Sequence, residues 1–164
     1  MGHGDQSTLS DFKMIFNLLK NKHLSKSSVE IEKIVCGFSH SACLCASKVF
    51  VWGIAGSHET QIFKIPTLLE YCVDSNKNRV EFKDIIDVKL GEMLSLFLNT
   101  KVIFYENTNS FLKKGEVYGF GENTDNQLGM MKENIYNNYP QKIEGLKETI
   151  GHVNFFFSIL NKNS

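Results

Sequence analysis

Two stretches of the chain carry the same order of β-branched, aromatic and glycine residues. The first reads IEKIVCGFSHSACLCASKVFVWG, and the second reads IIDVKLGEMLSLFLNT, followed by an insertion and then GEVYGFG. Short apolar runs that end at glycine indicate strands and tight turns, and a pattern that recurs within one chain indicates a structural repeat. The chain therefore has to fold as at least two similar β-rich units.

Three pairs of residues fix the alignment of the two copies. They are Gly37 with Gly91, Gly53 with Gly121 and Pro66 with Pro140, at offsets of 54, 68 and 74 residues. The step from 54 to 68 predicts a 14-residue insertion in the second copy, within roughly residues 101–114. The alignment also superposes Trp52 on Phe120, directly before a glycine in each copy.

Each copy supplies the strands of one small twisted sheet with apolar residues on both faces. Such a sheet must stack against a similar neighbour, as propeller blades do. We predict an all-β, incomplete β-propeller of about two to three blades, with repeats over residues 31–84 and 85–147. The tail 148–164 either begins a third copy or stands outside the pattern, because no glycine falls into register. The four repeat glycines are expected where the backbone needs positive φ or a close approach; they are Gly37, Gly53, Gly91 and Gly121.

A separate N-terminal segment, residues 1–30, precedes the repeats. Within residues 8–20, apolar side chains recur at helical spacing behind the candidate N-caps Ser10 and Asp11, which predicts a short amphipathic helix. A cluster of Lys20, Lys22 and Lys26 follows. These lysines either contact phosphates or an acidic partner, or are solvated cations that are favoured near a helix C-terminus.

Composition narrows the class of partner. Lys plus Arg and Asp plus Glu each number 18, so the formal net charge is zero and no overall field draws the protein to nucleic acid. No cationic, apolar leader opens the chain, and no stretch reads as a membrane span, so we expect an intracellular, reducing compartment, cytoplasmic or nuclear. The four cysteines are then expected as free thiols. Their spacing predicts no metal site, and no motif calls for a cofactor.

The combined pattern resembles the repeats of the regulator of chromosome condensation family. Those repeats carry Cys-Gly-x-x-His-Ser, then Gly-x-Val-Tyr-x-Trp-Gly, then Asn-x-x-Gly-Gln-Leu-Gly. The matching residues here are Cys36, Gly37, His40, Ser41, Trp52, Gly53, Gly115, Val117, Tyr118, Gly121, Asn123, Gln127, Leu128 and Gly129. The resemblance covers roughly residues 31–147 and implies a propeller of about seven blades, so this chain supplies only part of a ring.

The departures from that pattern concern both copies. Leu94 stands in the second copy where the first has His40, and Asn126 stands where the turn expects glycine. Asn enters the left-handed region more readily than most residues. The loop IAGSHETQ of the first copy has lost the Gln-Leu-Gly signature. We expect His40 to be a buried histidine that hydrogen-bonds within its blade rather than a proton carrier.

No catalytic constellation is formed by the histidines, cysteines and acids, which predicts a binding protein rather than an enzyme. The candidate partner-binding residues lie in loops and in the insertion; they are Glu122, Asn123, Asp125, Asn126, Phe104 and Tyr105. The alternative for these residues is structural: Asn123 and Asp125 would bond their own turn, and Phe104 and Tyr105 would extend a strand.

Two functions remain open on this resemblance. The favoured one is a protein-interaction or scaffold module within a larger assembly, whose missing blades come from a longer chain or from neighbouring subunits. The alternative is a guanine-nucleotide exchange factor for a small GTPase, which rests on fold-level analogy.

Overall fold

Ten β-strands make up the part of the chain that the structure describes, and this part contains no helix. The structure is a computed structural model that describes residues 2–5, 9–11, 13–15, 30–55, 62–74, 76–105, 110–130 and 136–144. The strands form two sheets, which agrees with the prediction of an all-β, incomplete propeller.

The first blade is an antiparallel sheet with the strand order β1-β2-β3-β4. Its strands are β1 (Ile31–Cys36), β2 (His40–Cys45), β3 (Lys48–Ile54) and β4 (Ile62–Leu68). Neighbouring strands along the chain are therefore neighbours in the sheet, as expected for a meander joined by short turns.

The second blade repeats this meander and carries two further strands at its outer edge. Its sheet has the order β6-β5-β10-β9-β8-β7. The meander consists of β7 (Ile85–Leu90), β8 (Leu94–Tyr105), β9 (Ser110–Glu122) and β10 (Tyr136–Lys142). The added hairpin consists of β5 (Tyr71–Val73) and β6 (Arg79–Glu81), and β5 pairs in parallel with β10.

The strand registers of the two blades agree with all three sequence offsets. The β1–β2 pair has an irregularity between Ile31 and Lys33, and the β7–β8 pair has the same irregularity 54 residues later. In the outer part of each blade, Gly53 pairs with Phe63 and Gly121 pairs with Asn137, at offsets of 68 and 74 residues. The two copies therefore share one fold as well as one sequence pattern.

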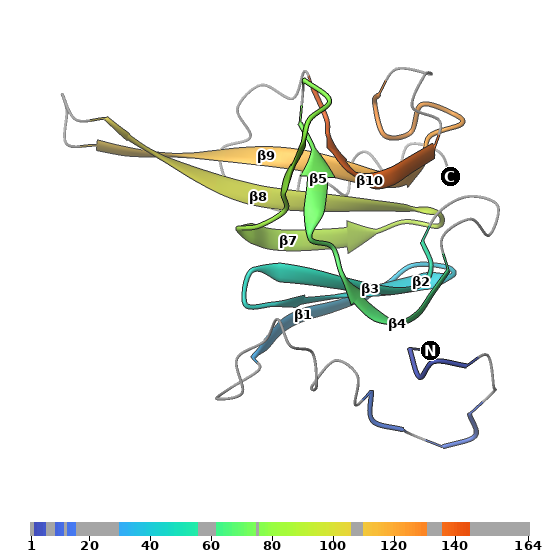
Figure 1. Cartoon of the computed structure of the whole chain (residues 1–164). Coiled ribbons are helices and arrows are strands. Elements are labelled where there is room, and N and C mark those ends of the chain that lie inside the picture. The colour runs from blue at the N-terminus through green and yellow to red at the C-terminus, as the bar shows by residue number, and fades with distance from the viewer. Residues whose placement is uncertain are drawn as a thin grey trace.

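The insertion in the second copy lengthens a hairpin. In the first blade β2 and β3 are joined through Ala46 and Ser47, whose φ angles of 51° and 57° are those of a two-residue type I′ turn. In the second blade the pairing continues outward from Thr100 opposite Gly115 to Tyr105 opposite Ser110. Figure 1 shows this β8–β9 hairpin projecting beyond the end of β7.

The two blades stack face to face, as Figure 1 shows. We call the face of each blade that carries Ile34 or its counterpart Val88 the front, and the opposite face the back. The back of the first blade packs on the front of the second in one buried cluster. Its main members are Ala42, Leu44, Val49 and Val51 on the first blade, and Ile85, Val88, Phe97, Tyr118 and Phe120 on the second.

The helix predicted over residues 8–20 is not found. Residues 9–11 and 13–15 are not helical, and the rest of that segment lies outside the described residues, as does the lysine cluster at positions 20–26. Ile15 packs instead against the front of the first blade. Tertiary contact has overridden a weak local preference, because helix propensity amounts to tenths of a kcal/mol per residue, roughly, and a short isolated helix is marginal.

Candidate interaction surfaces

Two glycines hold the blades in their repeated shape. Gly53 and Gly121 have φ angles of 97° and 107°, and a Cβ would lie 2.4 Å from the carbonyl oxygen of Ser39 at the first and 2.3 Å from that of Met93 at the second. Each glycine follows a buried aromatic, Trp52 in the first blade and Phe120 in the second, so the two rings take equivalent positions.

The remaining repeat glycines have different surroundings. At Gly37 an added Cβ would lie 2.5 Å from the carbonyl oxygen of Gly91, so the two blades approach closely at this pair. Gly129 has a φ of 65°, and only Ile143 lies within 4 Å of the point that a Cβ would occupy, so the requirement there is conformational rather than steric.

A hydrogen bond crosses the interface between the blades. His40 Nε2 on the first blade lies 3.0 Å from Ser95 Oγ on the second, and both residues are buried. Burial lowers the pKa of His40, and a hydrogen bond with the backbone of Leu94 opposes this only in part. The neutral imidazole is therefore favoured, which suits a structural contact between blades rather than proton transfer.

An ion pair also crosses the interface. Lys33 on β1 contacts the carboxylate of Asp87 on β7, and these two residues occupy the same position of the repeat, 54 residues apart. Asp87 is 3 % exposed, and its Oδ1 also accepts a hydrogen bond of 2.8 Å from the amide of Val88. A buried carboxylate needs such a partner, so the second blade depends on a lysine that the first blade supplies.

The front of the first blade is only partly covered. Ile31 and Ile34 on β1 are 41 % and 58 % exposed, whereas their counterparts Ile85 and Val88 on the second blade are 0 % and 1 % exposed. The outer part of the same face is a buried cluster of Cys43, Cys45, Phe50 and Trp52. The front of the second blade is thus covered by the first blade, whereas the equivalent front of the first blade is only half covered.

The loop that follows β9 is held by a buried amide. Asn123 is fully buried; its Oδ1 accepts from the amide of Leu128 at 2.9 Å and its Nδ2 donates to the carbonyl of Met130 at 3.2 Å. Asn126 has a φ of 57°, in the left-handed region. Among the candidate contact residues of this loop, Asp125 and Asn126 are exposed and Glu122 is half-buried.

Phe104 and Tyr105 lie at the outer end of β8, opposite Phe111 and Ser110 of β9. Their backbones belong to the projecting hairpin, as the structural alternative expects. Their side chains lie outside what the structure describes.

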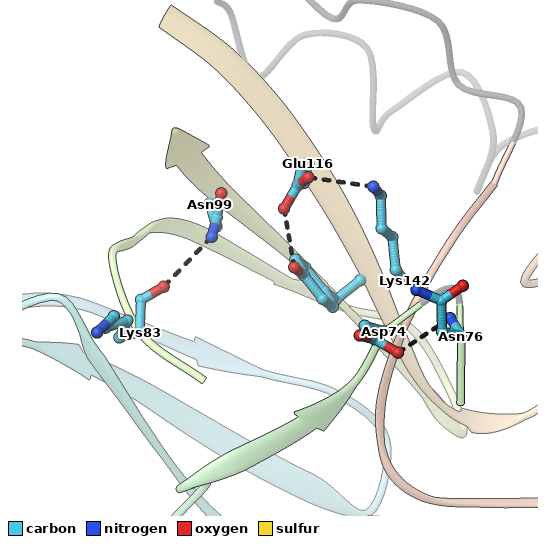
Figure 2. A network of polar contacts seen from close by, with 7 residues as sticks. Asp74, Asn76, Lys83, Asn99, Glu116 and Lys142 are labelled. Carbon is cyan, nitrogen blue, oxygen red and sulfur yellow. Dashed lines mark hydrogen bonds and ion pairs between the residues drawn. The ribbon is translucent and has the colours of Figure 1, made fainter. Parts of the chain in front are cut away.

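A polar network fastens the outer strands of the second blade (Figure 2). Glu116 on β9 accepts a hydrogen bond of 2.9 Å from the hydroxyl of Tyr118 and pairs with Lys142 on β10 at 3.1 Å. Burial and the adjacent Glu116 raise the pKa of Tyr118, and burial raises the pKa of the neighbouring Cys72 to about 11. Both groups are therefore neutral at ordinary pH and act in packing.

The described residues include no group of three or more His, Cys, Asp or Glu that could hold a metal ion. The described cysteines, Cys36, Cys43, Cys45 and Cys72, are all free thiols. Within the same residues, no helix is long and apolar enough to cross a membrane.

Comparison with known families bears on the second blade. The family model described as Regulator of chromosome condensation (RCC1) repeat matches residues 114–154. Residues 114–154 are therefore similar to an RCC1 repeat. The matched unit starts in β9 and passes through the Asn123 loop and β10, so it joins the outer half of the second blade to the segment after it.

The RCC1 match extends past residue 147, where the sequence pattern ends the second copy, into the tail that either begins a third copy or stands outside the pattern. Residues 145–154 lie outside the described part of the chain. The match and the two stacked sheets together support a propeller-type architecture. A search among curated proteins found no match.

The contacts between blades could have been read partly from the alignment. The 54-residue offset aligns Lys33 with Asp87. Opposite charges at one repeat position are compatible with an ion pair between neighbouring blades, and the structure shows this pair. The covering of the first blade by the described N-terminal residues had no such signal, because they stand outside the repeat.

Proposed function

We propose that this chain is a protein-interaction module within a larger assembly, and that the front of the first blade receives another β-sheet. The observation that carries the proposal is the contrast between Ile34, 58 % exposed, and its counterpart Val88, 1 % exposed. Val88 is covered by the back of a neighbouring blade. Because Ile34 occupies the same position of the same fold, the sheet that fits it has a back of small and branched aliphatic side chains like that of the first blade.

In the assembled protein such a sheet comes from a longer chain or from a neighbouring subunit. In the purified protein the bare fronts of two copies can meet, because the back of each first blade is already buried against its own second blade. Two exposed isoleucines favour association, and so does β1, which is an edge strand among the described residues, because bare apolar surface and unpaired strand edges promote association.

Light scattering of the purified chain over a range of concentrations tests the proposal. We expect a mass that rises with concentration above that of one 18.7 kDa chain. Ile34→Asp should weaken this association by about tenfold or more, because a carboxylate would be desolvated at the contact. Ile86→Asp is the matched control. Ile86 also lies on a strand and is 46 % exposed, but it is not part of the buried cluster between the blades. Equal association of the parent and the Ile34 variant would contradict the proposal.

The alternative implied by the resemblance, nucleotide exchange on a small GTPase, is separated by a release assay with a fluorescent guanine nucleotide. Acceleration at catalytic amounts of this protein would contradict a purely scaffolding role.

A further inference from the structure

The N-terminal segment lies on the outer half of the front of the first blade. Ile15 packs against the buried cluster of Cys43, Cys45, Phe50 and Trp52. The backbone of Gly2 lies against the indole ring, since a Cβ on Gly2 would be 3.0 Å from Trp52 Cδ1. The described parts of this segment, residues 2–5, 9–11 and 13–15, thus touch the face that a neighbouring blade would cover.

The same segment engages the edge of the first blade. The amide of Gly4 donates a hydrogen bond of 2.9 Å to the carbonyl of Lys64 on β4, the outermost strand of that sheet. An edge strand offers a row of unpaired backbone groups, and a segment that takes one of them competes with any strand that would pair there.

The equivalent face of the second blade shows what the segment replaces. Phe97, Tyr118 and Phe120 are the counterparts of Cys43, Phe50 and Trp52, and they are buried in one cluster with the back of the first blade and with Leu69, Cys72 and Phe82 of the segment that connects the blades. The N-terminal segment covers the outer residues of this face but leaves Ile31 and Ile34 on the inner strand exposed. It therefore acts in place of a preceding blade over one half of the face only.

The contact is loose compared with the packing between blades. An open pocket of about 440 Å³ lies at this contact, lined by both the segment and the sheet, including Leu9, Asp11, Ile15, Ser41 and Trp52. The segment therefore covers this part of the sheet incompletely, whereas the facing blades share one buried cluster.

From these contacts we infer that residues 2–5, 9–11 and 13–15 form an intramolecular cap on the blade-docking face of the first blade, and that the first blade of a second copy displaces this cap in order to dock. The inference rests on the proposed function, because it takes the front of the first blade as the docking face. An open repeat face is apolar and is stabilised by such a cover. The bare isoleucine strip gives the incoming sheet its first contact, and the outer aromatic cluster becomes available as the cap leaves.

The test loosens the cap in the full chain and follows the only tryptophan of the sequence, Trp52. Ile15→Asp places a carboxylate against the cluster, and Met14→Asp is the matched control because Met14 is 60 % exposed. We expect Ile15→Asp, and not Met14→Asp, to shift Trp52 emission to longer wavelength and to increase its quenching by acrylamide. The thiols of Cys43 and Cys45, whose pKa values are raised by burial, should also react faster with a disulfide reagent.

Self-association of the same variants decides whether the cap competes with docking. Ile15→Asp should strengthen association by about tenfold, the effect of removing roughly 1.4 kcal/mol of competing contact. Gly4→Pro, which removes the hydrogen-bond donor at the β4 edge, should act in the same direction and guards against an unfolding effect of either variant alone.

Two results would overturn the inference. Unchanged Trp52 emission in both variants would mean that the segment does not cover the face. A more exposed Trp52 with unchanged or weaker association would mean that the segment covers the face without competing for it. Failure of the proposed function gives a different result, in which Ile34→Asp leaves association unaltered in both the parent and the Ile15→Asp background.

Discussion

Replacement of Gly121 by alanine tests the repeat geometry most directly. At this residue β9 crosses the loop between β7 and β8, with a φ of 107°, and an added Cβ would lie 2.3 Å from the carbonyl oxygen of Met93. Both the conformation and the contact exclude a side chain, so the backbone must shift for alanine to fit. The same reasoning applies to Gly53 in the first blade, where the contact is 2.4 Å from Ser39.

The expected cost has two parts. A non-glycine residue held in a sparsely populated region of φ and ψ costs about 1–3 kcal/mol. Forcing an extra methyl group into filled space costs typically about 1–3 kcal/mol more. Gly121→Ala should therefore lower the free energy of unfolding by about 3 kcal/mol or more, and the melting temperature by about 6–12 °C for a chain of this size.

Gly129→Ala provides the control. Gly129 also has positive φ, 65°, but the nearest atom to an added Cβ is 3.9 Å away. Only the conformational part remains, and in the left-handed helical region this part costs about 1–2 kcal/mol. Urea unfolding followed by circular dichroism compares the variants. A Gly121 variant no less stable than the Gly129 variant would refute the assignment of Gly121 as a steric crossing point.

Three further predictions concern the interface between the blades and the inserted hairpin. Lys33→Met should lower the free energy of unfolding by about 1–3 kcal/mol, because Asp87 is left buried without its cation, and Lys33→Met with Asp87→Asn should recover most of the loss; a double variant no better than the single one in urea unfolding would contradict this. Burial lowers the pKa of His40 in the folded chain from its usual value of 6.5. As the pH falls, the unfolded chain therefore binds this proton before the folded chain does, so the free energy of unfolding should decrease below about pH 6.5. His40→Leu should lose less stability than the parent when thermal melts at about pH 7.5 and about pH 5.5 are compared, and an equal loss in both would refute the assignment. Replacing residues 100–115 by an Asn-Gly turn should change the free energy of unfolding by less than about 1 kcal/mol, since the first blade closes the same hairpin with two residues; loss of cooperative unfolding would show that the hairpin is needed for the fold.

The two blades could be predicted because their turns leave signatures in the sequence. Glycines at fixed offsets mark the places where φ is positive or where strands cross, and the aromatic before each glycine marks the buried end of the third strand. These requirements act locally, residue by residue, so they survive when the rest of a repeat diverges.

The hairpin β5–β6 had no such signature. Its strands are three residues each, too short to show an alternating pattern. It is held by pairing with β10 and by the guanidinium of Arg79, which lies 3.9 Å from the ring centre of Tyr71 and 4.7 Å from that of Tyr139. Two of these three residues are distant in sequence from the third, and only the folded sheet brings them together.

The role of Asn123 could be only half predicted. Its place in the turn pattern indicates both a contact residue and a turn residue, because an exposed and a buried amide look the same in a sequence. The structure places its side chain within its own loop, bonded to Leu128 and Met130. The predicted N-terminal helix is absent at residues 9–11 and 13–15 for a related reason. Apolar spacing predicts which side chains become buried, but not which surface buries them.

The opposite charges of Lys33 and Asp87 have a consequence for how the blades are ordered along the chain. If two copies of the first blade met in this arrangement, a lysine would face a lysine, and two copies of the second would bring together two buried carboxylates. Only a first blade followed by a second blade pairs the lysine with the carboxylate. Gene duplication yields interchangeable units, and a single change of sign at one site is enough to make them distinct, so that a nascent chain with two almost alike sheets has one correct way to assemble.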